Sequence, residues 1–173
     1  MHKLMPGLPL VLLALFAAET KPTAATYVTK SDIQAIFKQA PQDGVSDKQI
    51  RAVSVGKVNV AIAAVYRSAK ANNTSIEHDQ VTEVYTIIEG TGTMVTGGKM
   101  INPDRLKPDD PTVKVLVGPS IRGGALEGGE SRKVGPGDMI IVPAGVPHWF
   151  SSIDGVIRYS VVRVDPDKLL PPK

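Results

Sequence analysis

The segment that says most about the architecture of this protein is Gly137-Asp138-Met139-Ile140-Ile141-Val142-Pro143-Ala144-Gly145-Val146-Pro147-His148-Trp149-Phe150. Its apolar run, residues 139–142, lies between a Gly-Asp turn and a Pro-Ala-Gly turn, and this pattern predicts a short β-strand. Gly145 suits a turn that needs positive φ, and Pro147 favours an extended Val146 before it. His148 is therefore expected to begin a second strand at a set angle to the first.

Outward from this segment, the chain reads as further short strands separated by glycine and proline. The apolar and β-branched runs that predict them lie at residues 58–66, 82–89, 93–96 and 156–164. The 16 glycines and 14 prolines among 173 residues also favour a turn-rich architecture. The sequence therefore predicts an all-β sandwich or barrel over about residues 50–165.

One helix is expected before these strands, over residues 29–40. Ser31 is its expected N-cap, Asp32 suits the positive end of the helix dipole, and Pro41 ends it. The apolar residues of this segment share one face, which we expect to lie against the larger β structure.

Residues 97–129 depart from the strand pattern because they are rich in glycine, proline and aspartate. Within them, only residues 113–117 predict a strand. A long insertion of this kind in a compact domain is usually functional or mobile. A decorative surface loop is the alternative, and both interpretations remain open.

The first 25 residues have the build of a secretory signal peptide: a short basic start, an apolar run at residues 8–18 and then small residues. This apolar run is shorter than the roughly 20 residues that cross a bilayer. We therefore expect a mature protein, residues 26–173, that forms a single domain, is periplasmic or secreted, and has no membrane anchor.

Composition excludes several kinds of function. The chain has no cysteine, which rules out disulfides, thiolate zinc sites and a cysteine nucleophile. Its formal charge of +3 comes without a cluster of basic residues, and only one Trp and three Phe are available for stacking. Nucleic acid is therefore not an expected partner.

After residue 25 the chain contains two histidines, His78 and His148. Glu83 follows His78 by an odd spacing, which points the two side chains to opposite faces of a straight strand. A bend or bulge near residues 79–80 is needed for both to face inward. The residues on the same faces, which we expect to line a largely apolar pocket, are Tyr85, Ile87, Val146 and Phe150.

Two spacings resemble the paired motifs of the cupin superfamily, over residues 58–164. The first motif is matched in its later part by His78, four residues, Glu83, six residues and Gly90. The second is matched at every fixed spacing by Gly137, Pro143, Gly145 and His148. The stretch Thr82-Glu83-Val84 is also similar to the germin branch. Two positions depart from the family pattern: Ile76 replaces the first histidine, and Ser152 replaces the final asparagine.

The resemblance implies a double-stranded β-helix, or jelly-roll barrel, with the short helix outside it. It also implies a homodimer and one divalent transition metal, Fe, Mn, Ni, Cu or Zn. The residues themselves support such a site, because His78, Glu83 and His148 are a sufficient set of ligands. The same trio can form the facial triad of a non-haem iron oxygenase or a catalytic zinc site.

Other side chains have open roles at this stage. Tyr85 is a general acid or a packing residue, and Gln80, which we place in the pocket lining beside Ile76, is a candidate for the missing ligand. Arg158 and Arg163 are expected to be solvated charges on the outer face, with an anionic substrate as the alternative partner.

These residues favour a metal-dependent enzyme, with an oxygenase ahead of an isomerase, decarboxylase or lyase. Ile76 makes the neighbourhood of the metal less polar, which favours an apolar or aromatic small molecule as substrate. The alternative is a non-catalytic periplasmic binding protein with a vestigial metal site, in which residues 97–129 cover the ligand.

Overall fold

The computed structural model describes residues 23–71 and 73–173. The expected signal peptide falls on residues 1–25, of which residues 1–22 lie outside this range. None of the helices formed by the described residues has the length and apolar character needed to span a bilayer.

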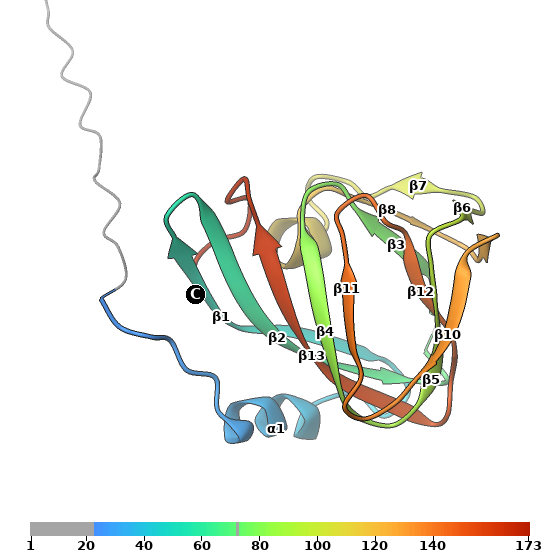
Figure 1. Ribbon diagram of the computed structural model, residues 1–173, viewed down its shortest axis with the longest axis horizontal. Helices are drawn as coiled ribbons and strands as arrows, with labels where there is room; N and C mark the ends of the chain where they lie inside the picture. Colours follow the sequence, from blue (N-terminus) through green and yellow to red (C-terminus); the bar gives the residue numbers. More distant parts are fainter. Residues whose placement is uncertain (1–22, 72) are drawn as a thin grey trace, which may run out of the picture.

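Most of the described chain forms antiparallel strands in two large sheets that curve toward each other (Figure 1). The five-stranded sheet has the order β1 (Val45–Val55), β2 (Val58–Ser68), β13 (Val156–Asp165), β4 (Thr82–Glu89), β11 (Met139–Val142). The six-stranded sheet has the order β10 (Glu130–Val134), β5 (Gly92–Thr96), β12 (His148–Ile153), β3 (Ser75–His78), β8 (Ser120–Gly123), β7 (Asp104–Arg105). A small third sheet pairs β6 (Lys99–Met100) with β9 (Leu126–Glu127). This is the all-β jelly-roll barrel that the sequence predicts.

The strands bury one face because their sequences alternate. Along β13, buried and partly exposed residues alternate without exception, so Ile157, Tyr159 and Val161 all point into the barrel. They join a core formed by both sheets, which includes Ile87 on β4 and Phe150 on β12. Burying apolar side chains between the sheets stabilises the barrel by roughly 25 cal/mol for each Å² removed from water.

The helix α1 (Lys30–Lys38) lies outside the barrel against β1 and β2. It begins earlier than a cap at Ser31 would allow, because its N-cap is Thr29. The reason is a reciprocal capping box: the Thr29 hydroxyl accepts from the Asp32 amide, and the Asp32 carboxylate accepts from the Thr29 amide at 2.9 Å.

Residues 113–117 form a π-helical turn, η1 (Val113–Val117), instead of the strand expected there. The Asp110 side chain accepts a hydrogen bond from the Thr112 amide at 2.7 Å, and its carbonyl accepts from the Lys114 amide. These local hydrogen bonds close a helical turn and outweigh the β propensity of the valines. The surrounding segment also supplies β8, which pairs with β3 inside the six-stranded sheet.

Candidate metal centre

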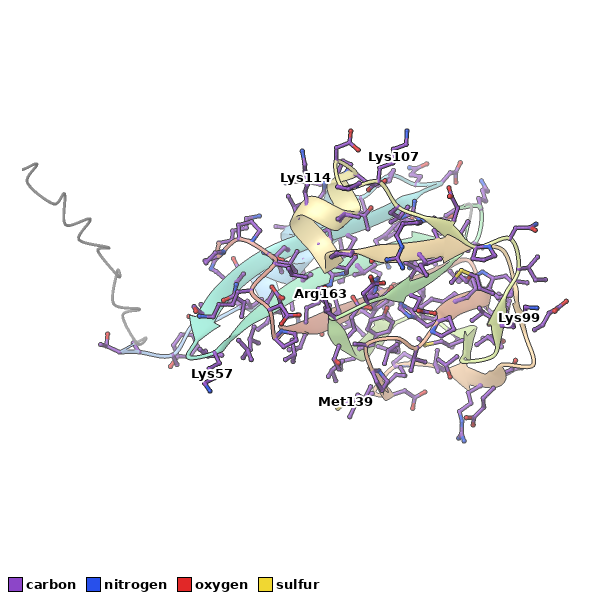
Figure 2. The ribbon with its side chains drawn as sticks, turned by 90° about the horizontal axis from the view of Figure 1, so that it is seen from above. Lys57, Lys99, Lys107, Lys114, Met139 and Arg163 are labelled. Atoms are coloured by element: carbon purple, nitrogen blue, oxygen red, sulfur yellow. The ribbon has the colours of Figure 1, made fainter. Side chains whose placement is uncertain are left out.

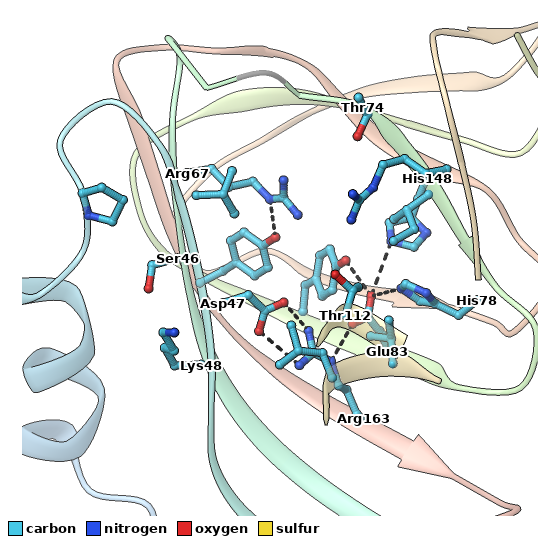
Figure 3. Close-up of a pocket in the computed structure, with 18 of the residues that line it drawn as sticks. Ser46, Asp47, Lys48, Arg67, Thr74, His78, Glu83, Thr112, His148 and Arg163 are labelled. Carbon is cyan, nitrogen blue, oxygen red and sulfur yellow. Dashed lines mark hydrogen bonds and ion pairs between the residues drawn. The ribbon is translucent and has the colours of Figure 1, made fainter. Parts of the chain in front are cut away.

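The structure brings His78, Glu83 and His148 together inside the barrel (Figure 3). The Nε2 atoms of both histidines lie 3.4 Å from Oε2 of Glu83, and one ligand atom from each residue lies within 4.8 Å of the others. All three side chains are buried, with Glu83 only 1% exposed.

The change of direction predicted near residues 79–80 is how these side chains meet. β3 ends at His78 in the six-stranded sheet, and β4 begins at Thr82 in the five-stranded sheet. The chain therefore crosses from one sheet to the other between His78 and Glu83, so their odd spacing no longer separates them. His148 begins β12 and lies opposite Ile76 of β3, which places it beside His78.

Hydrogen bonds on the outer nitrogens set the orientation of both imidazoles. The Ser120 hydroxyl donates to the Gly118 carbonyl at 2.9 Å, so it accepts from Nδ1 of His78 at 3.0 Å. Nδ1 of His148 donates to the Val146 carbonyl at 3.1 Å. When Nδ1 of a neutral imidazole donates in this way, the lone pair of its Nε2 is directed at Glu83.

The Ser120 hydrogen bond yields a prediction for metal affinity. Ser120→Ala frees the imidazole of His78 to rotate and to change tautomer, so we expect metal affinity to fall by about 10–100-fold. Competition with a coloured chelator measures the change. The matched control is Ser151→Ala on β12, whose exposed hydroxyl bonds only the Thr93 carbonyl; equal affinity in the two variants would contradict the prediction.

Glu83 is held from its other side by a buried arginine. Nε of Arg163 donates to Oε1 of Glu83 at 2.8 Å, and its terminal nitrogens donate to both oxygens of Asp47 at 3.1 and 2.5 Å. Burial opposes ionisation of Glu83, but His78, whenever its imidazole is protonated, and the permanent positive charge of Arg163 hold the pKa of the Glu83 carboxyl well below its usual range. Burial lowers the pKa of the His78 imidazole, which favours its neutral form.

This donor set fits a divalent transition metal. While the imidazoles are neutral, their two Nε2 lone pairs and the Glu83 oxygen converge with no imidazole proton between them. These electron-rich atoms repel one another unless a cation lies among them. Two carboxylates against one guanidinium also leave a net charge of −1 among Glu83, Arg163 and the partly buried Asp47. Nitrogen and carboxylate ligands of this kind suit Zn, Fe, Mn, Ni or Cu.

Tyr85 contacts the same carboxylate. Its hydroxyl donates to Oε2 of Glu83 at 2.7 Å, and its ring lies 4.7 Å from the ring of Tyr159. Burial and the Glu83 carboxylate raise the pKa of the Tyr85 hydroxyl well above its usual range. In this geometry Tyr85 keeps its proton and directs it at a ligand atom.

A cavity of about 690 Å³ opens beside the three donors. Ile76 and Tyr85 line it, whereas Ile87, Val146 and Phe150 do not; Ile87 and Phe150 belong to the hydrophobic core and Val146 packs against that core. Tyr159 lines the cavity, and its ring lies 5.7 Å from the ring of Phe150, which does not line it. Gln80 does not line it either, because it lies in the turn between β3 and β4.

The lining is also more polar than the sequence predicts. Besides the three donors, its polar and charged side chains include those of Ser46, Asp47, Lys48, Arg67, Thr74, Thr112, Arg122 and Arg163. Several of them come from β1 and from the segment 97–129. These side chains face the cavity only because distant parts of the chain pack together.

Arg163 is the main functional residue that sequence reasoning misplaced. The sequence predicts it on the outer face, yet it is 2% exposed and points inward (Figures 2 and 3), while labelled lysines such as Lys57 and Lys99 lie at the periphery. The strict alternation of β13 held the information, because Arg163 shares the parity of Tyr159 and Val161. Arg158 has the opposite parity, and it pairs with the exposed Glu89; its side chain is 25% exposed, so it is less solvated than the outer-face charge expected from the sequence.

Three solved structures are similar to this chain in part. The DMSP lyase DddQ from Ruegeria pomeroyi DSS-3 is 18% identical over 75% of this chain, with a TM-score of 0.46, and the match spans 50% of the length of that relative. KdgF from Halomonas sp. is 13% identical over 73% of this chain and 85% of its own, with a TM-score of 0.45. The L-ribose isomerase from Cellulomonas parahominis is 11% identical over 61% of this chain and 49% of its own, with a TM-score of 0.40. No curated protein sequence matches the chain.

A comparison with protein families is more decisive. The family described as Cupin matches residues 51–168, which is well over half of the chain. The matched range contains His78, Glu83 and His148, and it contains all of the strands except the first part of β1. The chain therefore belongs to the cupin family.

Proposed function

We propose that this protein is a metal-dependent enzyme that acts on a small organic molecule bound in the cavity beside His78, Glu83 and His148, by oxygenase-type chemistry. The observation that carries the proposal is the convergence of three buried donors on one wall of a cavity of about 690 Å³. A divalent metal held by these three donors would polarise a substrate oxygen as a Lewis acid or, as Fe(II), would activate dioxygen.

The protein residues have distinct tasks in this proposal. Ser120 and the Val146 carbonyl orient the two imidazoles, and Arg163 engages Oε1 of Glu83 so that Oε2 faces the site. Tyr85 holds its proton at the same Oε2. Burial of the donors keeps bulk water away from the reacting groups, which strengthens the electrostatic interactions there.

Oxygen uptake by the Fe(II)-loaded protein tests this function. We expect uptake with at least one member of a panel of catechols, diketones and small hydroxy acids, and loss of that uptake in His78→Ala. Glu89→Gln, which changes an exposed carboxylate on the same strand as Glu83, is the control and should keep full uptake. Bound metal with no turnover across the panel would contradict an oxygenase.

One observation favours a second candidate, a non-catalytic ligand-binding protein. Among the described residues that line the cavity, both carboxylates are committed: Glu83 to the histidines and Arg163, and Asp47 to Arg163. A free general base is therefore lacking on the cavity wall. Thermal stabilisation by a ligand without any turnover would support this candidate over the enzyme.

Two further proposals concern the setting of the protein. We propose export to the periplasm or the exterior, supported by the apolar run at residues 8–18; the intact mass of exported protein should place the new terminus near residue 26.

We also propose a homodimer, supported by exposed Met139 and Ile141 on β11, the edge strand of its sheet. Light scattering that gives a monomer mass would contradict the homodimer.

A further inference from the structure

The charges that line the cavity are not balanced. Arg163 pairs with both Glu83 and Asp47, which are the carboxylates of the lining. Arg67 and Arg122 line the same cavity, and neither has an ion-pair partner within residues 23–71 and 73–173. Asp47 attracts Arg67 and Asp110 attracts Arg122 from beyond ion-pair distance. Asp47 is engaged by Arg163, however, so neither guanidinium at the cavity is held in an ion pair within the described part of the chain.

Of the two arginines, Arg67 is the one whose orientation is fixed by a hydrogen bond. It lies on β2 and is half-buried, and its Nε donates to the Tyr159 hydroxyl at 2.9 Å (Figure 3). Burial raises the pKa of that hydroxyl, so Tyr159 orients the guanidinium without neutralising it. The two terminal nitrogens of Arg67 have no hydrogen-bond partner in the described part of the structure.

Leaving a half-buried guanidinium with unpaired N–H donors costs free energy unless a ligand or water accepts hydrogen bonds from those donors. The free edge of Arg67 presents two parallel N–H groups, which match the two oxygens of a carboxylate better than a point charge does. The bond from Tyr159 fixes the plane of this edge, so less conformational entropy is lost when an anion binds.

Arg67 is also connected to the donor set along one wall of the cavity. Its partner Tyr159 lies against the ring of Tyr85, and Tyr85 donates to Glu83. A small acid with its carboxylate at Arg67 would rest the remainder of its structure on the two tyrosine rings. Its far end would then face the three donors.

We propose that Arg67, assisted by Arg122, binds a carboxylate of the ligand, and that this protein acts on small organic acids. The inference rests on the proposed function only in treating the ligand as a substrate. It adds a charged group to the apolar or aromatic small molecule expected from the sequence, and it keeps Ile76 and the tyrosines as contacts for the uncharged part of the acid.

Binding of matched probes to chelator-treated protein tests the proposal, because a metal cannot then attract the carboxylate. Titration calorimetry at low salt compares benzoate with benzamide, which has the same shape without the charge, and with inorganic phosphate. We expect benzoate to bind at least about tenfold more tightly than benzamide or phosphate, a difference of one decade in Kd.

Arg67→Gln should abolish this preference, reducing benzoate affinity to that of benzamide. Arg67→Lys keeps the charge without the planar fork and should restore part of the preference. Arg132→Gln removes an exposed arginine that pairs with Glu130 away from the cavity, and it should bind both probes as the native protein does. Circular dichroism and thermal unfolding confirm that each variant is folded.

The outcomes separate this proposal from the proposed function. Equal binding of benzoate and benzamide, no binding of either, or tighter binding of phosphate would overturn the carboxylate site even if the Fe(II) form consumes oxygen. A benzoate preference that Arg67→Gln does not reduce would overturn the assignment to Arg67. A preference lost in Arg67→Gln, in a protein without turnover, would support the site and contradict the enzyme.

Discussion

Arg163→Met is expected to lower the free energy of unfolding by about 3–5 kcal/mol, because it leaves two carboxylates without their shared cation inside the barrel. Glu83 is 1% exposed and Arg163 is 2% exposed, so water replaces the lost guanidinium poorly at Glu83, whereas Asp47, with a side chain 19% exposed, keeps some access to water. A loss of this size is a large part of the roughly 5–15 kcal/mol that stabilises an ordinary domain. Urea unfolding of the metal-free protein measures the change.

Two comparisons show whether charge is the cause. Arg132→Met removes an arginine whose side chain is 77% exposed in its pair with Glu130, and it should cost less than about 1 kcal/mol. Combining Arg163→Met with Asp47→Asn and Glu83→Gln removes the stranded charges together and should recover part of the loss. A single Arg163→Met variant within about 1 kcal/mol of the native protein would refute the argument.

His148→Ala and Glu83→Ala should each remove most of the bound metal. Each deletes one of only three ligands among the described residues, so the effect should exceed the roughly 10–100-fold loss expected for an outer hydrogen-bonding partner. Glu83→Ala also removes the anionic ligand. Elemental analysis of protein purified without chelator, followed by titration with Fe, Mn, Ni or Zn, should give one ion per chain in the native protein only.

Conservative variants guard against a loss of folding. His148→Gln and Glu83→Gln keep side-chain volume in the core, and circular dichroism checks that the barrel is intact. Glu89→Gln changes an exposed carboxylate on β4 and should bind metal normally. A native protein that takes up none of the four metals would contradict the metal centre and favour the ligand-binding protein.

The sequence by itself determined the class of fold and the donor set. Runs of β-branched residues with Gly and Pro between them predict strands, and the alternation along residues 156–164 is already present in the order of the amino acids. The fixed spacing from Gly137 to His148 likewise predicts how a histidine enters β12. These features are local, because turn and strand preferences act between residues a few positions apart.

Only the tertiary structure decided what surrounds the donors. Ser120 is 42 positions from the histidine it orients, Tyr159 is 92 from Arg67, and Asp47 is 116 from Arg163. Such contacts depend on the register between strands that are distant in sequence and on the curvature of two sheets. In the same way the Asp110 turn made a π-helical segment of residues 113–117. The network around Glu83 and the anion-binding edge of Arg67 arise when the barrel closes, since no local pattern places those side chains on one wall.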